Sequence, residues 1–113
     1  MDDCLFCRIV AGEIPATVVH ETDVTMAFRD IAPKAPTHVL VIPKAHHTDI
    51  EALVNADPAL AERLLVEAAQ VADAEGIGDA WRLVFNTGAG AGQTVFHTHL
   101  HLLAGRPMTW PPG

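Results

Sequence analysis

The feature that most constrains this chain is a run near its C-terminal end in which histidine stands at every second position. The run is Val95-Phe96-His97-Thr98-His99-Leu100-His101-Leu102-Leu103. A period of two predicts a half-buried β-strand, because successive side chains of a strand point to opposite faces. The three imidazoles would then share one face, while Leu100 and Leu102 point into a core. Buried polar rings are costly without partners, so the pattern favours a metal site or a nucleophilic or acid–base site over a solvated face that happens to carry histidine.

Length and composition restrict the kind of protein this chain forms. With 113 residues, half of them hydrophobic and 19% charged, we expect a single domain over residues 1–113 with a real core. The formal charge of −7 argues against nucleic-acid binding, although a small phosphorylated ligand stays possible. We find neither a run of about 18 apolar residues nor a basic and apolar signal segment. We therefore expect no membrane association and a cytoplasmic location.

The remaining patterns predict an α+β fold. A short helix is expected over about Cys4–Ala11, stopped by Gly12, and a long one from Asp57 as N-cap and Pro58 to Glu75-Gly76. The strands expected besides the histidine run are Thr17–Glu21, Val24–Phe28, Thr37–Ile42 and Trp81–Asn86. These elements predict a five-stranded, mainly antiparallel sheet with one long and one short helix.

The long helix is expected to bury one face. Its core face would consist of Leu60, Leu64, Leu65, Ala68, Val71 and Ala72, and its outward face of Glu62, Arg63, Glu67 and Gln70.

A C-x-x-C pair, Cys4 and Cys7, opens the chain. A redox pair usually follows a strand, and no strand fits before residue 4, so zinc binding is favoured over redox chemistry or two idle thiols. The pair needs two more ligands. Three histidines on one flat strand span about 13 Å, so at most two of them could meet at one ion. His46 and His97 are plausible suppliers, which predicts a structural Cys2His2 zinc and leaves the other two histidines of the run free for chemistry.

The free histidines suit nucleophilic catalysis on phosphorus. A neutral imidazole is a good nucleophile at pH 7, and an imidazole bonded to phosphorus is a reactive intermediate. Gln93 and Thr94, just before the run, would bind phosphoryl oxygens, and the glycine-rich stretch 87–94 is either a flexible hairpin connection or a loop whose N–H groups approach phosphate. That stretch lacks the Walker spacing. No acidic pair lies near the run, so no metal is expected to be required for catalysis.

The residues together resemble the histidine triad (HIT) family. The triad run matches its signature, and so do segments spread over the whole chain. These are Gly12-Glu13-Ile14-Pro15, Phe28-Arg29-Asp30-Ile31, Ala35-Pro36-Thr37-His38, Val41-Ile42-Pro43-Lys44, Gly92-Gln93-Thr94-Val95-Phe96 and the ending Trp110-Pro111-Pro112-Gly113. The match is to the branch of histidine triad nucleotide-binding proteins (HINT), in its zinc-binding C-x-x-C form.

By position, the resemblance implies a set of catalytic roles. His99 would be the nucleophile that takes the nucleotidyl group, His101 would contact the phosphate, and His97 would help to orient the centre. His38 and Thr94 would belong to a polar relay near the leaving group.

The resemblance also implies ligands and partners. Asp30 would hold the ribose hydroxyls, which donate to a carboxylate. The base would be enclosed by Phe6, Ile9, Ile14, Phe28 and Ile31. The sugar and phosphate would be approached by Asn86, Gly92 and Gln93. The zinc ligands would be Cys4, Cys7, His46 and His97. The family further implies a homodimer in which two sheets join, with Trp110 reaching toward the site of the partner subunit.

The activity implied is hydrolysis of the P–N bond of a purine nucleoside phosphoramidate of the AMP-amine type through a nucleotidyl-His99 intermediate. Three alternatives stay open: a dinucleoside polyphosphate hydrolase, a non-enzymatic nucleotide sensor or adaptor, and a zinc hydrolase with the triad as ligands. Two residues depart from the family pattern, Thr98 in place of a hydrophobic residue and Thr94 where serine is common. Neither His20 nor His47 matches a family role, and both are expected on the surface.

Overall fold

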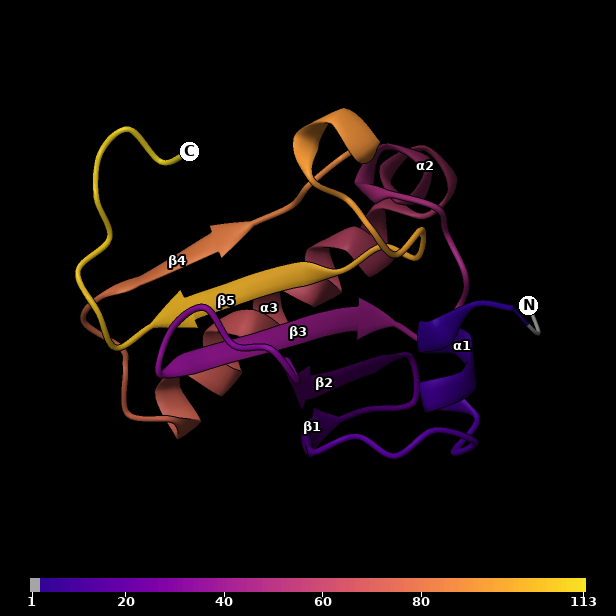
Figure 1. The fold of residues 1–113 in the computed structure, drawn as a ribbon. Coiled ribbons are helices and arrows are strands. Elements are labelled where there is room, and N and C mark those ends of the chain that lie inside the picture. The colour runs from indigo at the N-terminus through magenta and orange to yellow at the C-terminus, as the bar shows by residue number, and fades with distance from the viewer. Residues whose placement is uncertain (1–2) are drawn as a thin grey trace.

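The computed structural model describes residues 3–113, and across them the chain forms an α+β fold built on one five-stranded sheet (Figure 1). The strands are β1 (Val18–Glu21), β2 (Thr25–Arg29), β3 (Thr37–Pro43), β4 (Trp81–Val84) and β5 (Leu100–Ala104). They lie in the order β1-β2-β3-β5-β4, and each neighbouring pair is antiparallel. The expected fold class is therefore confirmed.

The two predicted helices form where their caps indicated. Helix α1 runs over Leu5–Val10, and the long helix α3 runs over Pro58–Ala74. The Asp57 carboxylate accepts the Leu60 N–H at 3.1 Å, and Gly76 follows the end of α3 with a φ of 72°, a conformation that glycine adopts without strain. None of the helices within residues 3–113 is long and apolar enough to span a membrane.

A third helix, α2 (Ile50–Ala56), was not expected from the sequence. It is capped by Asp49, whose carboxylate accepts the Ala52 N–H at 2.8 Å, and it buries Leu53 completely. With seven residues it is too short to display a helical period, so the prediction of one long and one short helix was incomplete.

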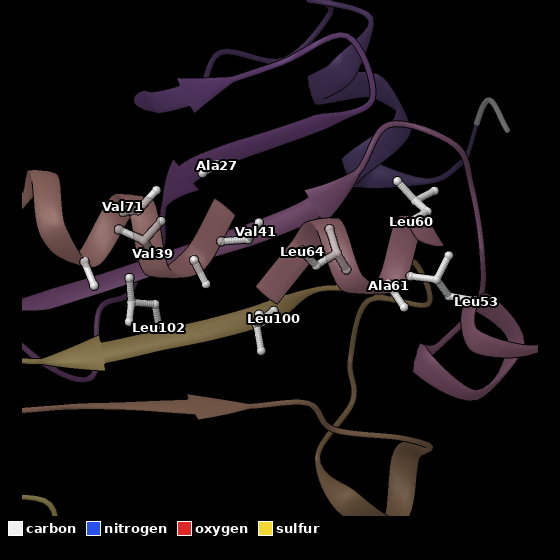
Figure 2. Close-up of a cluster of buried hydrophobic side chains, with 12 residues drawn as sticks. Ala27, Val39, Val41, Leu53, Leu60, Ala61, Leu64, Val71, Leu100 and Leu102 are labelled. Carbon is white, nitrogen blue, oxygen red and sulfur yellow. The ribbon is translucent and has the colours of Figure 1, made fainter. Parts of the chain in front are cut away.

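Helix α3 covers one face of the sheet and forms the main core with it (Figure 2). Leu64 and Val71 of α3 pack with residues of β3 and β5, of which Leu100 and Leu102 are completely buried, as expected. Apart from Leu65, the predicted core face of α3 is buried; the side chains of α3 and the strands that meet there include Leu60, Ala61, Leu64, Ala68, Val71, Ala72, Val39, Val41, Leu100 and Leu102.

The outward and inward faces of α3 differ from the prediction at two residues. Leu65, expected in the core, is 48% exposed, and Glu67, expected on the outward face, is 2% exposed. Arg63 donates to Oε1 of the buried Glu67 carboxylate at 2.9 Å, and His20 of β1 forms an ion-pair contact with Oε2. His20 is therefore a packing partner of α3 rather than a free surface residue.

The opposite face of the sheet carries a second apolar cluster and the polar residues of interest. Leu40 and Ile42 alternate with the α3-facing residues of β3 and pack with Phe6 of α1. Figure 1 shows α1 at the end of the sheet where β3 ends. His101 pairs with Leu40 and His38 with Leu103 across β3 and β5, so both histidines lie on the face turned away from α3.

Candidate active site and metal centre

The histidine run is not one strand. Strand β5 begins at Leu100, so only His101 lies in the sheet, while His97 and His99 belong to the segment that leads into it. Both the backbone N–H and the hydroxyl of Thr98 donate to the His47 carbonyl, at 2.7 and 3.0 Å, which ties this segment to the connection after β3 instead of to the sheet. The prediction that the three imidazoles share one strand face was wrong, and the departure from regular strand geometry lets them serve two different sites.

His97 belongs to a cluster of thiols and imidazoles beside α1. Cys4 is the N-cap of α1 and Cys7 lies one turn later. The Cys4 Sγ and Cys7 Sγ atoms are each 3.5 Å from His97 Nδ1, and Cys7 Sγ is 3.4 Å from His46 Nδ1. All four ligand atoms lie within 4.8 Å of one another. The geometry therefore assembles the four residues predicted as metal ligands, and of the adjacent pair after β3 it is His46, and not His47, that joins them.

The cluster fits a tetrahedral zinc ion. With Zn–S bonds of about 2.3 Å and Zn–N bonds of about 2.0–2.1 Å, a tetrahedral S···N edge is about 3.5 Å, the spacing found here. His97 Nε2–H donates to the Pro43 carbonyl at 2.7 Å, which leaves the Nδ1 lone pair free to face the sulfurs. Burial, and next Cys4, raises the pKa of the Cys7 thiol, so binding of an ion would displace its proton.

His99 is held with a defined proton position. Its Nδ1 lies 2.8 Å from the His97 carbonyl oxygen, and because a carbonyl can only accept, Nδ1 carries the hydrogen. The lone pair is therefore on Nε2. Burial lowers the pKa of His99, which keeps the ring neutral at pH 7. A neutral imidazole with a free Nε2 lone pair is equipped for nucleophilic attack.

His38 and His101 form a hydrogen-bonded chain whose direction is fixed at its start. The Lys34 backbone N–H donates to His38 Nδ1 at 3.0 Å, so His38 carries its hydrogen on Nε2. That Nε2–H donates to His101 Nδ1 at 2.9 Å, which places the hydrogen of neutral His101 on Nε2. Burial lowers the pKa of His101 to about 4. His101 Nε2 is buried without a partner, so it is a donor available to an anion beside His99, whose ring centroid is 5.0 Å away.

Asp30 completes the polar side of the site. Its Oδ1 accepts the Ala32 N–H at 2.8 Å, and its Oδ2 lies 3.5 Å from His38 Nε2. Ligand atoms of Asp30, His38 and His101 also lie within 4.8 Å of one another, but the two rings are already joined by a hydrogen bond. The two rings are therefore better described as a hydrogen-bonded pair beside the Asp30 carboxylate than as part of a metal site.

An apolar depression of about 280 Å³ lies next to His99. The Phe6 ring lines it and packs edge-on against His99, with ring centroids 5.1 Å apart. Among the sequence-predicted binding residues, those that line it are Phe6, Ile9, Ile14, Phe28, Asp30, Ile31 and Thr94. Lining residues that the sequence reasoning missed are Leu5, Pro15, Ala16, Arg29, Leu40 and Val95. Leu40 could have been found, because strand alternation puts it opposite Val39 and Val41.

Six predicted binding residues do not line the depression: Asn86, Gly92, Gln93, His99, His101 and Trp110. The Gln93 side chain donates to the Thr48 and Val95 carbonyls at 2.8 and 3.1 Å and accepts from the Gly88 N–H at 2.8 Å. It is 3% exposed, so it anchors the glycine-rich loop from inside. Trp110, by contrast, is 84% exposed.

Comparison with known proteins agrees with this geometry. Residues 11–108 match the sequence model of the HIT domain. The chain belongs to the HIT family. It is 52% identical over 112 residues to an uncharacterized HIT-like protein of Synechocystis, covering 99% of this chain and 98% of that one. It is 44% identical over 114 residues to a 14 kDa zinc-binding protein of Brassica juncea, covering 98% and 100% of the two chains.

Solved structures of other HIT proteins share this fold. The crystal structure of a HIT family hydrolase from Legionella pneumophila superposes on this HIT chain with a TM-score of 0.94 at 54% identity, covering 98% of this chain and 100% of that one. A HIT family hydrolase from Clostridium thermocellum gives a TM-score of 0.93 at 39% identity, covering 96% of each chain. The family assignment and the α+β fold are thus established together, and they make nucleotide hydrolysis the function class to consider.

Proposed function

We propose that this HIT protein hydrolyses the P–N bond of purine nucleoside phosphoramidates. We also propose that residues 1–113 form a single domain and that the protein is a member of the HINT branch. The observation that carries the proposal is the proton order of the triad. His99 offers a free Nε2 lone pair, and His101 offers an unpartnered Nε2–H beside it. A nucleophile next to an anion-binding donor is the arrangement that phosphoryl transfer requires.

In the proposed reaction His99 Nε2 attacks the α-phosphorus, the P–N bond to the amine breaks, and the departing amine takes a proton from solvent. Water then cleaves the nucleotidyl-His99 bond and releases the nucleoside monophosphate. Positive charge develops on His99 during attack, and the Nδ1–H···O=C bond to His97 stabilises it. His101 Nε2–H donates to a non-bridging phosphoryl oxygen. Both groups act where charge changes, which is where preorganised hydrogen bonds accelerate a reaction most.

Substrate binding follows from the depression beside His99. Its apolar walls, including Phe6 and Phe28, suit a flat nucleobase, and the Asp30 carboxylate at its edge suits the ribose hydroxyls. Thr94 lines the same depression and is exposed, which supports assigning its hydroxyl to the leaving group. We assign His38 a different part from the leaving-group relay, because it is 5% exposed and lies behind His101. It fixes the tautomer of His101.

Zinc is assigned a structural role at Cys4, Cys7, His46 and His97, where it would supply a fixed cross-link between α1, the connection after β3 and the triad segment. Catalysis itself would need only the side chains already described. The proposal is supported by the tetrahedral spacing of the ligand atoms and by the zinc-binding relative from Brassica juncea.

We also infer a homodimer. Strand β4 is at the edge of the sheet, and an unpaired edge presents backbone groups to a second chain. The Arg82 side chain of β4 donates to the Thr109 carbonyl at 2.9 Å, which places the neighbouring Trp110 near this edge. Trp110 is 84% exposed, which is unusual for tryptophan unless something covers it. A monomeric mass in light scattering at micromolar concentration would contradict this inference.

The activity is tested with a fluorogenic adenosine phosphoramidate. Wild type should turn the substrate over, His99→Ala should lose at least about a thousandfold in kcat/KM, and His47→Ala, which alters a histidine outside the site, should stay close to wild type. Turnover of His99→Ala near the wild-type rate would refute the mechanism. Faster hydrolysis of a dinucleoside polyphosphate, or tight AMP binding without turnover, would favour the two alternative functions instead.

A further inference from the structure

We propose that Cys4 and Cys7 are a reversible oxidation site. A two-electron oxidant such as hydrogen peroxide converts the pair into a disulfide, the pair then no longer holds a metal ion, and α1 loosens from the triad segment. The oxidation and the loosening stand independently of the hydrolytic activity. A further consequence, weaker nucleotide binding after oxidation, rests on the proposed function.

The two sulfurs are placed for bond formation. Cys4 is the N-cap of α1, and its Sγ accepts the Cys7 backbone N–H at 3.4 Å, so both sulfurs lie at the N-terminal end of the helix. The Cys4 Sγ and Cys7 Sγ atoms lie within 4.8 Å of each other, close enough that side-chain rotation brings them into bonding range. Because the chain contains two cysteines, an internal disulfide has one possible pairing.

The cluster is open to small solutes. A depression of about 570 Å³, lined by Asp3, Cys4, His46 and Thr48 among others, borders the metal centre. It adjoins the nucleobase depression, with which it shares Leu5, Thr94 and Val95. Both cysteines are partly exposed. A peroxide molecule can therefore reach Cys4 from solvent.

The hydrogen bonds that attach α1 depend on these two side chains, and they act in addition to the apolar packing of Phe6, Ile9 and Val10. Among the described residues, each side-chain hydrogen bond that joins Cys4–Val10 to the rest of the protein runs from a cysteine to His46 or His97. The Arg8–Glu13 ion pair stays within the N-terminal segment. The helix buries one side chain, Phe6, which lies between the two cysteines in sequence.

Phe6 transmits a change at the cysteines to the triad. Its ring packs edge-on against His97, His99 and Phe28, with centroid distances of 5.9, 5.1 and 5.4 Å. The same ring lines the apolar depression. Closing a disulfide draws both flanking side chains away from His46 and His97, so Phe6 loses the cross-links that hold it against the nucleophilic histidine.

The oxidation is balanced. Two thiolates, two protons and one hydrogen peroxide give one disulfide and two water molecules; the sulfurs lose two electrons and the peroxide O–O bond gains them. The disulfide sulfurs carry no negative charge and are poor ligands for a divalent ion. A dithiol reductant returns the electrons and restores both thiols.

The test uses the zinc-loaded, full-length protein treated with increasing hydrogen peroxide. A chromogenic chelator should report one zinc ion released per disulfide formed. Intact mass spectrometry should show the loss of two hydrogens, and neither cysteine should react with an alkylating reagent. Amide exchange in residues 5–11 should accelerate at least about tenfold. Affinity for AMP should fall about tenfold, the effect of losing one aromatic contact of about 1.4 kcal/mol. Dithiothreitol with added zinc should reverse all four changes.

Two variants sharpen the result. Cys7→Ser cannot form the internal disulfide, so peroxide should leave its exchange in residues 5–11 unchanged, whereas His47→Ala should respond as wild type does. Zinc release without the disulfide mass, a disulfide that forms with zinc retained, or a disulfide with unchanged exchange in α1 would each overturn the proposal. If the reduced protein fails to bind AMP, the proposed function fails, while zinc release and amide exchange still decide this inference.

Discussion

Replacing His38 tests whether the proton order of the histidine chain governs activity. This ring is 5% exposed, accepts the Lys34 N–H at 3.0 Å and donates to His101 at 2.9 Å. Glutamine has one acceptor and one donor at the end of its side chain, so His38→Gln can keep both bonds. His38→Phe keeps an aromatic ring and loses both. The two variants therefore separate ring packing from hydrogen bonding.

The size of the effect follows from these two bonds. A buried group left without its hydrogen-bond partner costs about 1–3 kcal/mol, and His38→Phe leaves the Lys34 N–H and His101 Nδ1 in that state. Without the bond from His38, His101 no longer holds its hydrogen on Nε2. If this raises the free energy of the transition state by the same 1–3 kcal/mol, kcat falls about 5- to 150-fold. His38→Gln should remain within about fivefold of wild type, since less than about 1 kcal/mol is lost.

Steady-state kinetics on the adenosine phosphoramidate measures kcat and KM for both variants, and urea unfolding measures their stability. The expected result is a low kcat with little change in KM for His38→Phe, and recovery of most of the kcat in His38→Gln. Equal activity of the two variants, whether both high or both low, would refute the reasoning, because hydrogen bonding at His38 would then have no separate effect on the reaction.

Three further predictions concern stability. Removing the metal with a strong chelator should lower the melting temperature by more than about 10 °C, and an unchanged melting curve would contradict a structural metal. Burial, followed by the neighbouring His99 and His38, lowers the pKa of His101 to about 4. The unfolded chain therefore takes up a proton near pH 6.5 that the folded chain does not, so this stabilisation is complete above about pH 6.5 and is lost as the pH falls toward 4. At pH 5 the loss from His101 is about 2 kcal/mol, so urea unfolding at pH 7 and 5 should show a fall in stability about 2 kcal/mol smaller in His101→Gln than in wild type. On α2, Leu53→Ala should lower the free energy of unfolding in urea by about 2–5 kcal/mol, because Leu53 is completely buried. Val54→Ala should lower it by less than about 1 kcal/mol, because Val54 is 47% exposed. Similar losses in the two variants would contradict the assigned burial.

The elements with strong local signals were predictable. Asp57, Pro58 and Gly76 mark both ends of α3, because capping and φ preferences act over a few neighbouring residues. The sheet strands were recognisable as well, because short runs of β-branched and aromatic residues bounded by turn residues are also local signals. Helix α2 was not, since its formation depends on the Asp49 cap and on burying Leu53 against α3, and a contact between elements leaves no periodic trace in seven residues.

The site was partly predictable as well. The geometric limit on three histidines of one strand allowed at most two of them at one ion, and His97 was predicted as a ligand with His46; the structure places both beside the thiols. The strand assumption itself failed, because the two hydrogen bonds from Thr98 to the His47 carbonyl are long-range contacts that alternation does not encode. The burial of Glu67 was missed for a similar reason, since its partner His20 lies on β1.

The direction of the His38–His101 chain illustrates what only coordinates provide. It depends on the Lys34 backbone N–H reaching His38 Nδ1, four residues away along the chain. Sequence supplies the residue types and the family roles, but it does not say which nitrogen faces which partner. The tautomers, and with them the proposed nucleophile and anion donor, follow from the hydrogen bonds.

The central claim is that His99 Nε2 forms a covalent bond to phosphorus. The most direct measurement is rapid mixing of the protein with an adenosine phosphoramidate, quenching in alkali, where phosphorus–imidazole bonds survive, and peptide mapping by mass spectrometry. The account predicts a nucleotidyl group on the peptide that contains His99, attached to that residue, which appears and decays during turnover. Continued turnover with no adduct, or an adduct on another residue, would contradict it.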